Sequence, residues 1–329
     1  MSVSRVVHGT RRVTPEVERK VRAAIEKVGY EPNEAARILK GYRARVLGLI
    51  VPDLSDPFLA TCANAVQETA REAGYMTLMA ASGGREDVER KLTEIMMQRH
   101  VAGFLVIPSG SRNDHFAIVK KSRVPIVSLD RPLKRVETDT LTVDNRLAAA
   151  RMTGHLISHG HRQILCIADD KSVFTSNERI VGYSQAMRRA ELPVQVRLIR
   201  PIDGRISEKL KSVLDSVSSV TALFAINNVL AVRVLRELQR REVQMPERIA
   251  LAAFDDFDAA TLVRPTITVV RQPIAELGKR AAELVLARLR NDAIPSPSRI
   301  VLGTELVIRQ SCGCGRRYLE TSESGAKTV

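Results

Sequence analysis

The sequence predicts an α/β protein with a body of two doubly wound parallel-sheet subdomains, preceded by a small basic helical segment. From residue 46 onward, short apolar runs alternate with helical segments, which is typical of buried parallel strands in βαβ units. The 329 residues, 44% of them hydrophobic, suffice for two or three domains. Positive charge gathers at the start, with 11 Lys and Arg against 5 Glu between Arg5 and Arg45.

Overall charge and composition narrow the function classes. A net charge of +14 favours a polyanionic partner, and its concentration near the N-terminus predicts contacts with phosphates. There is no run of 18 apolar residues and no signal-peptide pattern, so we expect a cytoplasmic protein without a membrane segment. Four unevenly spaced cysteines agree with a reducing compartment and not with a disulfide framework.

Two helical segments precede residue 30. Residues 2–9 have the character of the last turns of a helix that Gly9 closes, and a second helix begins with Thr14 as its cap and Pro15 at its first position. Its apolar stripe consists of Val17, Val21, Ala24, Ile25 and Val28. One amphipathic helix and the last turns of another cannot bury a core. Together with the basic charge of this segment, this predicts a small DNA-binding domain whose N-terminal part is missing.

The stretch 29–40 is predicted to be a connector that can be helix or coil. Pro32 presets a helical φ, Asn33 can cap a helix, and residues 34–40 are good helix formers. A helix of about two turns is too short to be stable alone in water. The connector therefore needs a partner surface to fold against, and such an element can act as a switch.

The body is predicted to contain two successive sets of strands and helices. The first set has strands at 46–51, 76–80, 103–107 and 124–129, and helices at 57–74, 87–99 and 113–122. The second set has strands at 163–168, 222–225 and 249–253, and helices at 147–159, 179–190 and 229–242. Two open sheets in tandem leave a cleft between their carboxyl edges, where ligands bind in such folds.

Several motifs agree in order and spacing with one family. Ser-Val-Ser-Arg-Val-Val-His-Gly at 2–9, Val-Thr-Pro-Glu-Val at 13–17 and Val-Gly-Tyr-Glu-Pro-Asn-Glu-Ala-Ala-Arg-Ile-Leu-Lys at 28–40 resemble the headpiece of LacI/GalR (lactose-repressor) transcriptional regulators. The match continues through Val-Leu-Gly-Leu-Ile-Val-Pro-Asp at 46–53 to about residue 309. The resemblance implies a helix-turn-helix headpiece, a hinge helix that folds on operator DNA, and a homodimeric periplasmic-binding-protein-like core.

The resemblance assigns DNA contacts to Ser4, Arg5, Asn33, Ala36 and Leu39. Leu39 would be the wedge that each subunit inserts into the minor groove, where added contacts offset the cost of unstacking a base step; alternatively, it caps the core of the body. Arg5 alone matches a base-facing position, because the family's first helix, turn and start of the recognition helix precede the residues present here. Either the start codon lies further upstream, or a truncated headpiece weakens operator binding.

Residues at the ends of the strands and in the loops that follow are predicted to line the cleft. They supply carboxylates, an amide and guanidinium groups, which suit hydroxyl, carboxylate or phosphate groups, and a ring that can stack on an apolar face. At the matching positions the family binds a sugar, a nucleobase or a related metabolite. We therefore expect the effector to contact Asp56, Phe58, Asp130, Arg131, Arg179, Asn227, Asp255 and Gln272.

Structural roles are open alternatives for several of these residues. Asp56 precedes a proline and can be a helix cap only, and Asn227 can simply cap the next helix. Asp130 and Arg131 can form a structural ion pair at a strand end. The neighbouring Asp256 is expected to be a turn former.

Other candidate chemistry is weaker. His155 and His159 have the spacing of a metal pair, but no third ligand is evident in the sequence. Cys312 and Cys314 could chelate a metal or sense oxidation, but without a second Cys/His pair we expect a reduced, flexible tail. We predict no cofactor and no metal site. Phosphate-binding, nucleophile-elbow and dinucleotide motifs are absent from the sequence, so we do not expect an enzyme.

The combined prediction is a ligand-responsive, DNA-binding repressor. The alternative is an N-terminally truncated soluble small-molecule-binding protein with weak or no specific DNA binding. The predicted boundaries are a headpiece at 1–30, a hinge at 31–45, a first subdomain at about 46–144 plus 272–294, a second subdomain at about 145–271 plus 295–310, and a flexible tail at 311–329.

Overall fold

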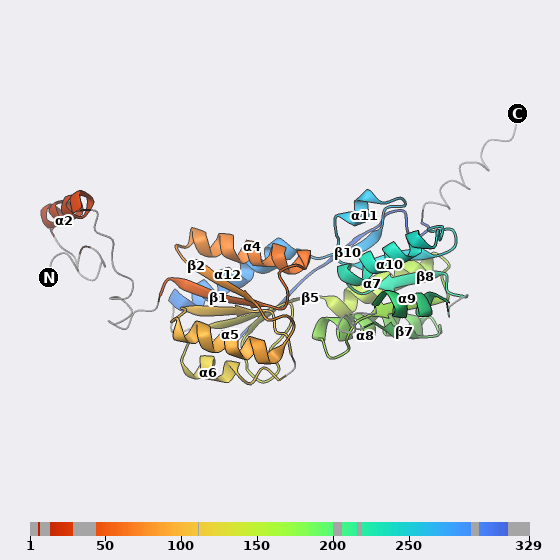
Figure 1. Cartoon of the computed structure of the whole chain (residues 1–329), viewed down its shortest axis with the longest axis horizontal. Helices are drawn as coiled ribbons and strands as arrows, with labels where there is room; N and C mark the ends of the chain where they lie inside the picture. The colour runs from red at the N-terminus through yellow and green to blue at the C-terminus, as the bar shows by residue number, and fades with distance from the viewer. Residues whose placement is uncertain are drawn as a thin grey trace, which may run out of the picture.

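The computed structural model describes residues 14–28, 44–110, 112–199, 206–215, 219–290 and 296–314, together with Val6. From residue 44 onward these residues form two lobes that lie side by side, each built around one six-stranded sheet (Figure 1). The α/β prediction with two doubly wound sheets is confirmed.

The first lobe has a wholly parallel sheet in the order β11-β5-β4-β3-β1-β2. Its strands are β1 (Val46–Val51), β2 (Met76–Ala81), β3 (Gly103–Val106), β4 (Ile126–Leu129), β5 (Asp139–Val143) and β11 (Arg299–Leu302). Its helices are α4 (Pro57–Glu72), α5 (Glu86–Gln98), α6 (Phe116–Lys121) and α12 (Ile274–Arg290). Helices α4 and α12 cover one face of the sheet, while α5 and α6 cover the other (Figure 1).

The second lobe repeats this winding in the order β12-β10-β9-β8-β6-β7, with β12 antiparallel to β10 and the other pairs parallel. Its strands are β6 (Ile164–Ala168), β7 (Gln195–Leu198), β8 (Ala222–Ala225), β9 (Ala250–Phe254), β10 (Thr268–Arg271) and β12 (Glu305–Val307). Its helices are α7 (Asn145–Ser158), α8 (Phe174–Arg189), α9 (Ile206–Asp215), α10 (Asn228–Arg240) and α11 (Ala259–Leu262).

Glycines allow two pairs of helices to pack closely. A Cβ at Gly182 of α8 would overlap the carbonyl oxygen of Arg146 in α7. In the first lobe, a Cβ at Gly278 of α12 would lie 2.5 Å from the carbonyl oxygen of Cys62 in α4. Backbone atoms cannot move aside as a flexible side chain can, so these two contacts fix how closely the helices of each lobe approach.

The chain crosses between the lobes three times, after β5, after β10 and after β11. The last crossing corrects a predicted boundary, since we expected residues 295–310 to belong to the second subdomain. Arg299 pairs with Thr140 and Leu302 pairs with Val143, so β11 extends the first sheet and the chain changes lobe at Gly303 and Thr304. A four-residue edge strand carries too little periodicity to reveal its sheet from sequence.

Two helix starts also differ from the prediction. Helix α6 begins at Phe116 and not at 113, because Asn113 has a left-handed φ of 44° and its carbonyl accepts a turn hydrogen bond from the Phe116 amide. Helix α8 begins at Phe174, so Arg179 lies in its second turn and not at its start.

The predicted flexible tail is wrong for residues 311–314. The Leu251 amide donates to the Ser311 carbonyl at 3.0 Å, and the Ser311 hydroxyl donates to the Leu251 carbonyl. Cys312 is fully buried and forms a disulfide with Cys314, which replaces the expected reduced pair. These residues therefore pack on β9, while residues 315–329 lie outside the described part of the chain.

The predicted second helix is present as α2 (Pro15–Val28), and none of its residues is buried. The predicted DNA contacts, Ser4, Arg5, Asn33, Ala36 and Leu39, lie outside the described residues, as does the connector at 29–40. Among the described helices, none is long and apolar enough to cross a membrane.

Candidate functional site

A cleft of about 260 Å³ lies between the carboxyl ends of the two sheets. Both lobes contribute to its walls. All eight residues predicted for the effector site line it, namely Asp56, Phe58, Asp130, Arg131, Arg179, Asn227, Asp255 and Gln272. Most of them come together because they follow a strand or begin a helix at this edge of a sheet, whereas Arg179 reaches the cleft from the second turn of α8.

Asp56 combines the cap role with a position in the cleft. Its carboxylate accepts a hydrogen bond from the Phe58 amide at 3.0 Å, which caps α4 beside Pro57. The same oxygen, Oδ1, accepts from Nδ2 of Asn228 at 2.9 Å. Because Asn228 begins α10 in the other lobe, this hydrogen bond spans the cleft.

Asp130 and Arg131 form the expected ion pair at the end of β4, with 3.1 Å between Nε of Arg131 and Oδ2 of Asp130. Arg131 also donates to the carbonyl of Pro108 at 3.1 Å. The pair is thus held by protein contacts and still reaches the cleft. The expected ion pair is therefore present, and the contact with the effector stays a prediction.

Arg179 is almost completely buried and is oriented by the second lobe. Its Nε donates to Oδ1 of Asn145 at 2.7 Å, and its Nη1 donates to the carbonyl of Ile226 at 2.8 Å. The guanidinium carbon lies 3.7 Å from the centre of the Phe254 ring. These contacts fix the orientation of the guanidinium fork at the cleft wall.

Asp255 stands at the centre of the second lobe's wall and is buried. It accepts hydrogen bonds from Nε2 of Gln272 and, at 3.2 Å, from the amide of Asn228, while Nη1 of Arg179 lies 3.8 Å away. Burial raises the pKa of Asp255 above its usual range, against the opposing charge of Arg179. Oε1 of Gln272 is buried without a hydrogen-bond partner among the described residues, which leaves an acceptor at the cleft.

Asp130 and Asp255 hold equivalent places in the two lobes. Each follows the fourth strand of its sheet, and each has a left-handed φ, +59° for Asp130 and +74° for Asp255. Such a backbone is uncommon for residues other than glycine and is often found at ligand sites. It turns both carboxylates toward the cleft.

Sequence reasoning missed several residues of the cleft wall. Asp169 accepts a hydrogen bond from Nδ2 of Asn227 at 3.0 Å and another from the hydroxyl of Ser176. Asn227 also caps α10 through the Leu230 amide, at 2.8 Å. Asp169 directly follows β6, so the strand-end rule that found Asp130 could also have found it. Other polar residues missed at the wall are Asp53, Thr175 and Arg233.

Asp256 is more than the expected turn former. Its carboxylate lies 2.8 Å from Nη2 of Arg271 and 2.8 Å from Nη2 of Arg309. The pair of arginines lowers its pKa even though burial alone would raise it. The residue fastens the segment after β12 to the second lobe and does not line the cleft.

Comparisons with known proteins agree with this architecture. The family model for a periplasmic binding protein-like domain matches residues 153–312. The HTH-type transcriptional regulator DegA of Bacillus subtilis is 30% identical over 320 residues, which cover 94% of this chain and 93% of DegA. The chain belongs to the LacI family of transcriptional regulators. The repressor CytR of Escherichia coli is 29% identical, over 94% of this chain and 92% of CytR.

Solved structures of transcriptional regulators share the fold of this LacI-family chain. The complex of the transcriptional regulator CelR with cellobiose has a TM-score of 0.74 at 27% identity and covers 94% of both chains. The Lac repressor dimer bound to operator has a TM-score of 0.80 at 19% identity, also over 94% of both chains. This LacI-family chain is a ligand-responsive transcriptional regulator and not an enzyme.

Proposed function

We propose that this regulator is a cytoplasmic, homodimeric repressor whose cleft binds a monosaccharide or a polyhydroxylated molecule of similar size. The composition of the cleft wall is the observation that supports this effector class. Five carboxylates and three guanidinium groups are the charged groups that line it: Asp53, Asp56, Asp130, Asp169 and Asp255, with Arg131, Arg179 and Arg233. Neighbouring acceptors and donors of this kind suit adjacent hydroxyl groups, whereas an excess of carboxylates disfavours a phosphate.

The size of the cleft supports a small effector. Its volume of about 260 Å³ lies below the usual 300 to 1,000 Å³ of small-molecule sites. Phe58, which lines the cleft, adds an apolar surface on which a sugar ring can stack. Cellobiose, a disaccharide, is the ligand in the CelR complex, whereas the volume of about 260 Å³ here favours a single ring.

The proposed mechanism couples the cleft to the operator. Effector binding closes the two lobes and changes the spacing of the first lobes in a dimer, which alters the cost of folding both hinge elements on DNA. A coupling of about 1 to 3 kcal/mol between the sites changes affinity about 5- to 150-fold. The predicted DNA contacts Ser4, Arg5, Asn33, Ala36 and Leu39 remain part of this proposal.

Two measurements test the proposal. Calorimetry with a panel of monosaccharides, nucleosides and sugar phosphates should give one neutral sugar that binds wild type and binds the Arg179→Lys variant at least about tenfold more weakly, because lysine lacks the planar fork. Preference for sugar phosphates would contradict the neutral-effector assignment. Selection from a random duplex pool should then enrich a pseudo-palindrome, and the effector should shift its affinity.

The same experiments separate the alternative function. A small-molecule-binding protein without specific DNA binding would bind the sugar but enrich no palindrome. Its retention on duplex DNA would vary with the salt concentration and not with the DNA sequence.

A further inference from the structure

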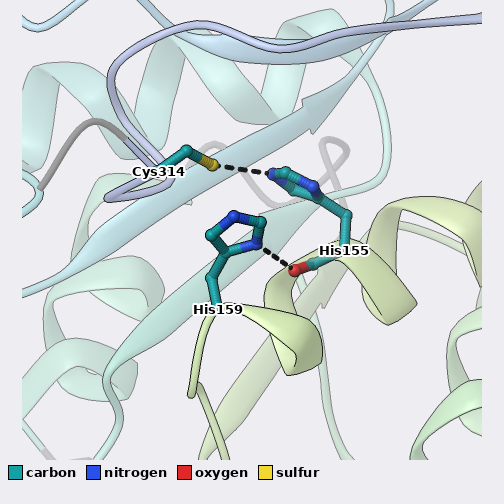
Figure 2. A group of neighbouring side chains, drawn as sticks. All are labelled: His155, His159 and Cys314. Atoms are coloured by element: carbon teal, nitrogen blue, oxygen red, sulfur yellow. Dashed lines mark hydrogen bonds between the residues drawn. The ribbon is translucent and has the colours of Figure 1, made fainter. Parts of the chain in front are cut away.

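Two motifs that are weak when taken alone meet in the second lobe. His155 and His159 lie at the C-terminal end of α7, and Cys314 lies on the turn that follows β12. Sγ of Cys314 is 3.0 Å from Nε2 of His155, and ligand atoms of all three residues lie within 4.8 Å of one another. Figure 2 shows the sulfur of Cys314 and the two histidine rings facing a common space. Each motif supplies what the other lacks for a metal site.

The hydrogen bond of the His159 ring suits coordination. Nδ1 of His159 lies 2.8 Å from the carbonyl oxygen of His155, as the dashed line in Figure 2 shows. Because a carbonyl oxygen can only accept, Nδ1 is the donor in this contact, and in the neutral ring the lone pair then lies on Nε2. Metal-bound histidines are oriented by such a hydrogen bond on the other ring nitrogen. The end of α7 also carries partial negative charge, which favours a cation.

The cysteine is held in a fixed position. Ser311 is hydrogen-bonded to β9 and to the amide of Thr268 at 2.9 Å, and Gly313 turns the chain with a φ of +79°. Cys314 is therefore presented by an anchored turn. In this structure it is bonded to Cys312, which is fully buried, whereas the three candidate ligands are partly exposed.

We propose that the reduced protein binds a Zn²⁺-class cation through His155, His159 and Cys314, with solvent as the fourth ligand, and that the Cys312–Cys314 disulfide blocks this site. A thiolate with two imidazoles suits Zn²⁺, whereas Mg²⁺ and Ca²⁺ require oxygen ligands. Ligand atoms around tetrahedral Zn²⁺ are about 3.3 to 3.7 Å apart, so the 3.0 Å separation of Cys314 Sγ and His155 Nε2 must lengthen slightly, while the widest separation, within 4.8 Å, must shorten by about 1 Å.

The redox step can be written in full. A dithiol reductant gives two electrons and two protons to the Cys312–Cys314 disulfide; the S–S bond breaks, two thiols form, and the reductant becomes a disulfide. The Cys314 thiol then releases its proton as it binds the cation. Cys312 stays in the core. When an oxidant removes two electrons from the two thiols, Cys312 forms the disulfide with Cys314, and Cys314 is no longer available as a metal ligand.

Cobalt spectroscopy of the full-length protein tests the site. With a phosphine reductant, one equivalent of Co²⁺ should produce a thiolate-to-cobalt charge-transfer band and the intense visible bands of tetrahedral Co²⁺, and Zn²⁺ should remove both. Without reductant, neither band should form. Burial raises the pKa of Cys62 to about 12, so this thiol contributes little thiolate. Absence of the charge-transfer band in reduced wild type would overturn the proposal.

Variants assign the ligands. Cys314→Ser should abolish the charge-transfer band, and His155→Ala or His159→Gln should weaken Co²⁺ binding by at least about 100-fold, more than the loss of an outer-shell group. Exposed His100 supplies the control, since His100→Asn should bind like wild type. Equal binding by all of these variants would show adventitious metal only.

The decisive variant concerns Cys312. Cys312→Ser should bind Co²⁺ without any reductant, because Cys314 then has no partner for the intramolecular disulfide; Cys312→Ala serves if serine disturbs the core. Retention of the reductant requirement in the folded variant, or loss of the charge-transfer band, would contradict the role given to Cys312.

Discussion

Asp56 combines a structural role with a position at the cleft. Its carboxylate caps α4 through the Phe58 amide and also accepts a hydrogen bond from Asn228 across the cleft. The cap needs only a side-chain oxygen, whereas ligand binding and the field of the cleft depend on the charge. Substitutions can therefore separate the two roles.

We expect Asp56→Asn to change the free energy of unfolding by no more than about 0.5 kcal/mol, because asparagine caps as well as aspartate. Asp56→Ala should lower it by about 1 kcal/mol through loss of the cap. Urea unfolding measures both values. Both variants should weaken effector binding. Normal binding by Asp56→Asn would show that the negative charge of Asp56 does not contribute to effector binding.

Helix pairs set the geometry of each lobe at the scale of the elements. In the second lobe, α7 and α8 touch at Gly182, where any side chain would meet the backbone carbonyl of Arg146. Gly154 of α7 faces solvent, and a Cβ added there would have no other atom within 4 Å. The two glycines are thus matched in residue type and differ only in surroundings.

Gly182→Ala should destabilise the protein by about 2 to 3 kcal/mol, because α7 and α8 must move apart. Gly154→Ala should stabilise it by about 0.5 to 1 kcal/mol, since alanine favours the helix without a steric cost. Thermal unfolding of both variants is the measurement. A similar effect at the two positions would mean that the close contact does not determine the packing.

Asp139 joins three elements of the first lobe. It begins β5, pairs with Arg288 of α12 at 2.7 Å and accepts from the amide and hydroxyl of Ser298, just before β11. Burial by itself would raise the pKa of Asp139, but these hydrogen bonds and the charge of Arg288 together lower it. The contact fastens the returning chain to the sheet edge.

The lowered pKa gives a pH test. A depressed carboxyl pKa stabilises the fold above the unfolded value of about 3.9 and loses that stabilisation as the pH falls through the folded value. Asp139→Asn should therefore cost about 1.5 to 3 kcal/mol at pH 7 and less at pH 3, where part of the stabilisation has been lost. Urea unfolding of wild type and the variant at both pH values measures the difference in their free energies of unfolding. A difference that is the same at pH 3 and pH 7 would contradict the lowered pKa of Asp139.

At the scale of the whole molecule, two lobes joined by three crossings can open and close around the cleft. The hydrogen bond from Asn228 to Asp56 links them in the present state. Asn228 also donates its backbone amide to Asp255, a contact that remains when its side chain is removed.

Asn228→Ala should shift the effector-free protein toward an open form about fivefold, since one hydrogen bond contributes about 1 kcal/mol. Small-angle X-ray scattering should show a larger radius of gyration than for wild type. Asp56→Asn is the control, because its amide oxygen can still accept from Asn228. An unchanged radius in Asn228→Ala would mean that this contact does not hold the lobes together.

The sequence determined most of the architecture and the ligand wall. Continuous apolar runs reveal buried parallel strands wherever they are long, as in β1 and β6, and a residue after such a strand must lie at the carboxyl edge. This local rule brought Asp130, Asp255 and their partners into one cleft. Short or half-exposed strands such as β11 and β12 carry weaker patterns, so their sheets were not predictable.

Only the tertiary structure decided which distant segments meet. Three contacts join residues far apart in the chain: the pairing of β11 with the first sheet, the hydrogen bonds of Ser311 to β9, and the approach of Cys314 to His155. Local patterns record burial and backbone preference, because these act over a few neighbouring residues. Partners across about 160 positions are chosen by the packing of whole sheets and helices, and no local period records that choice.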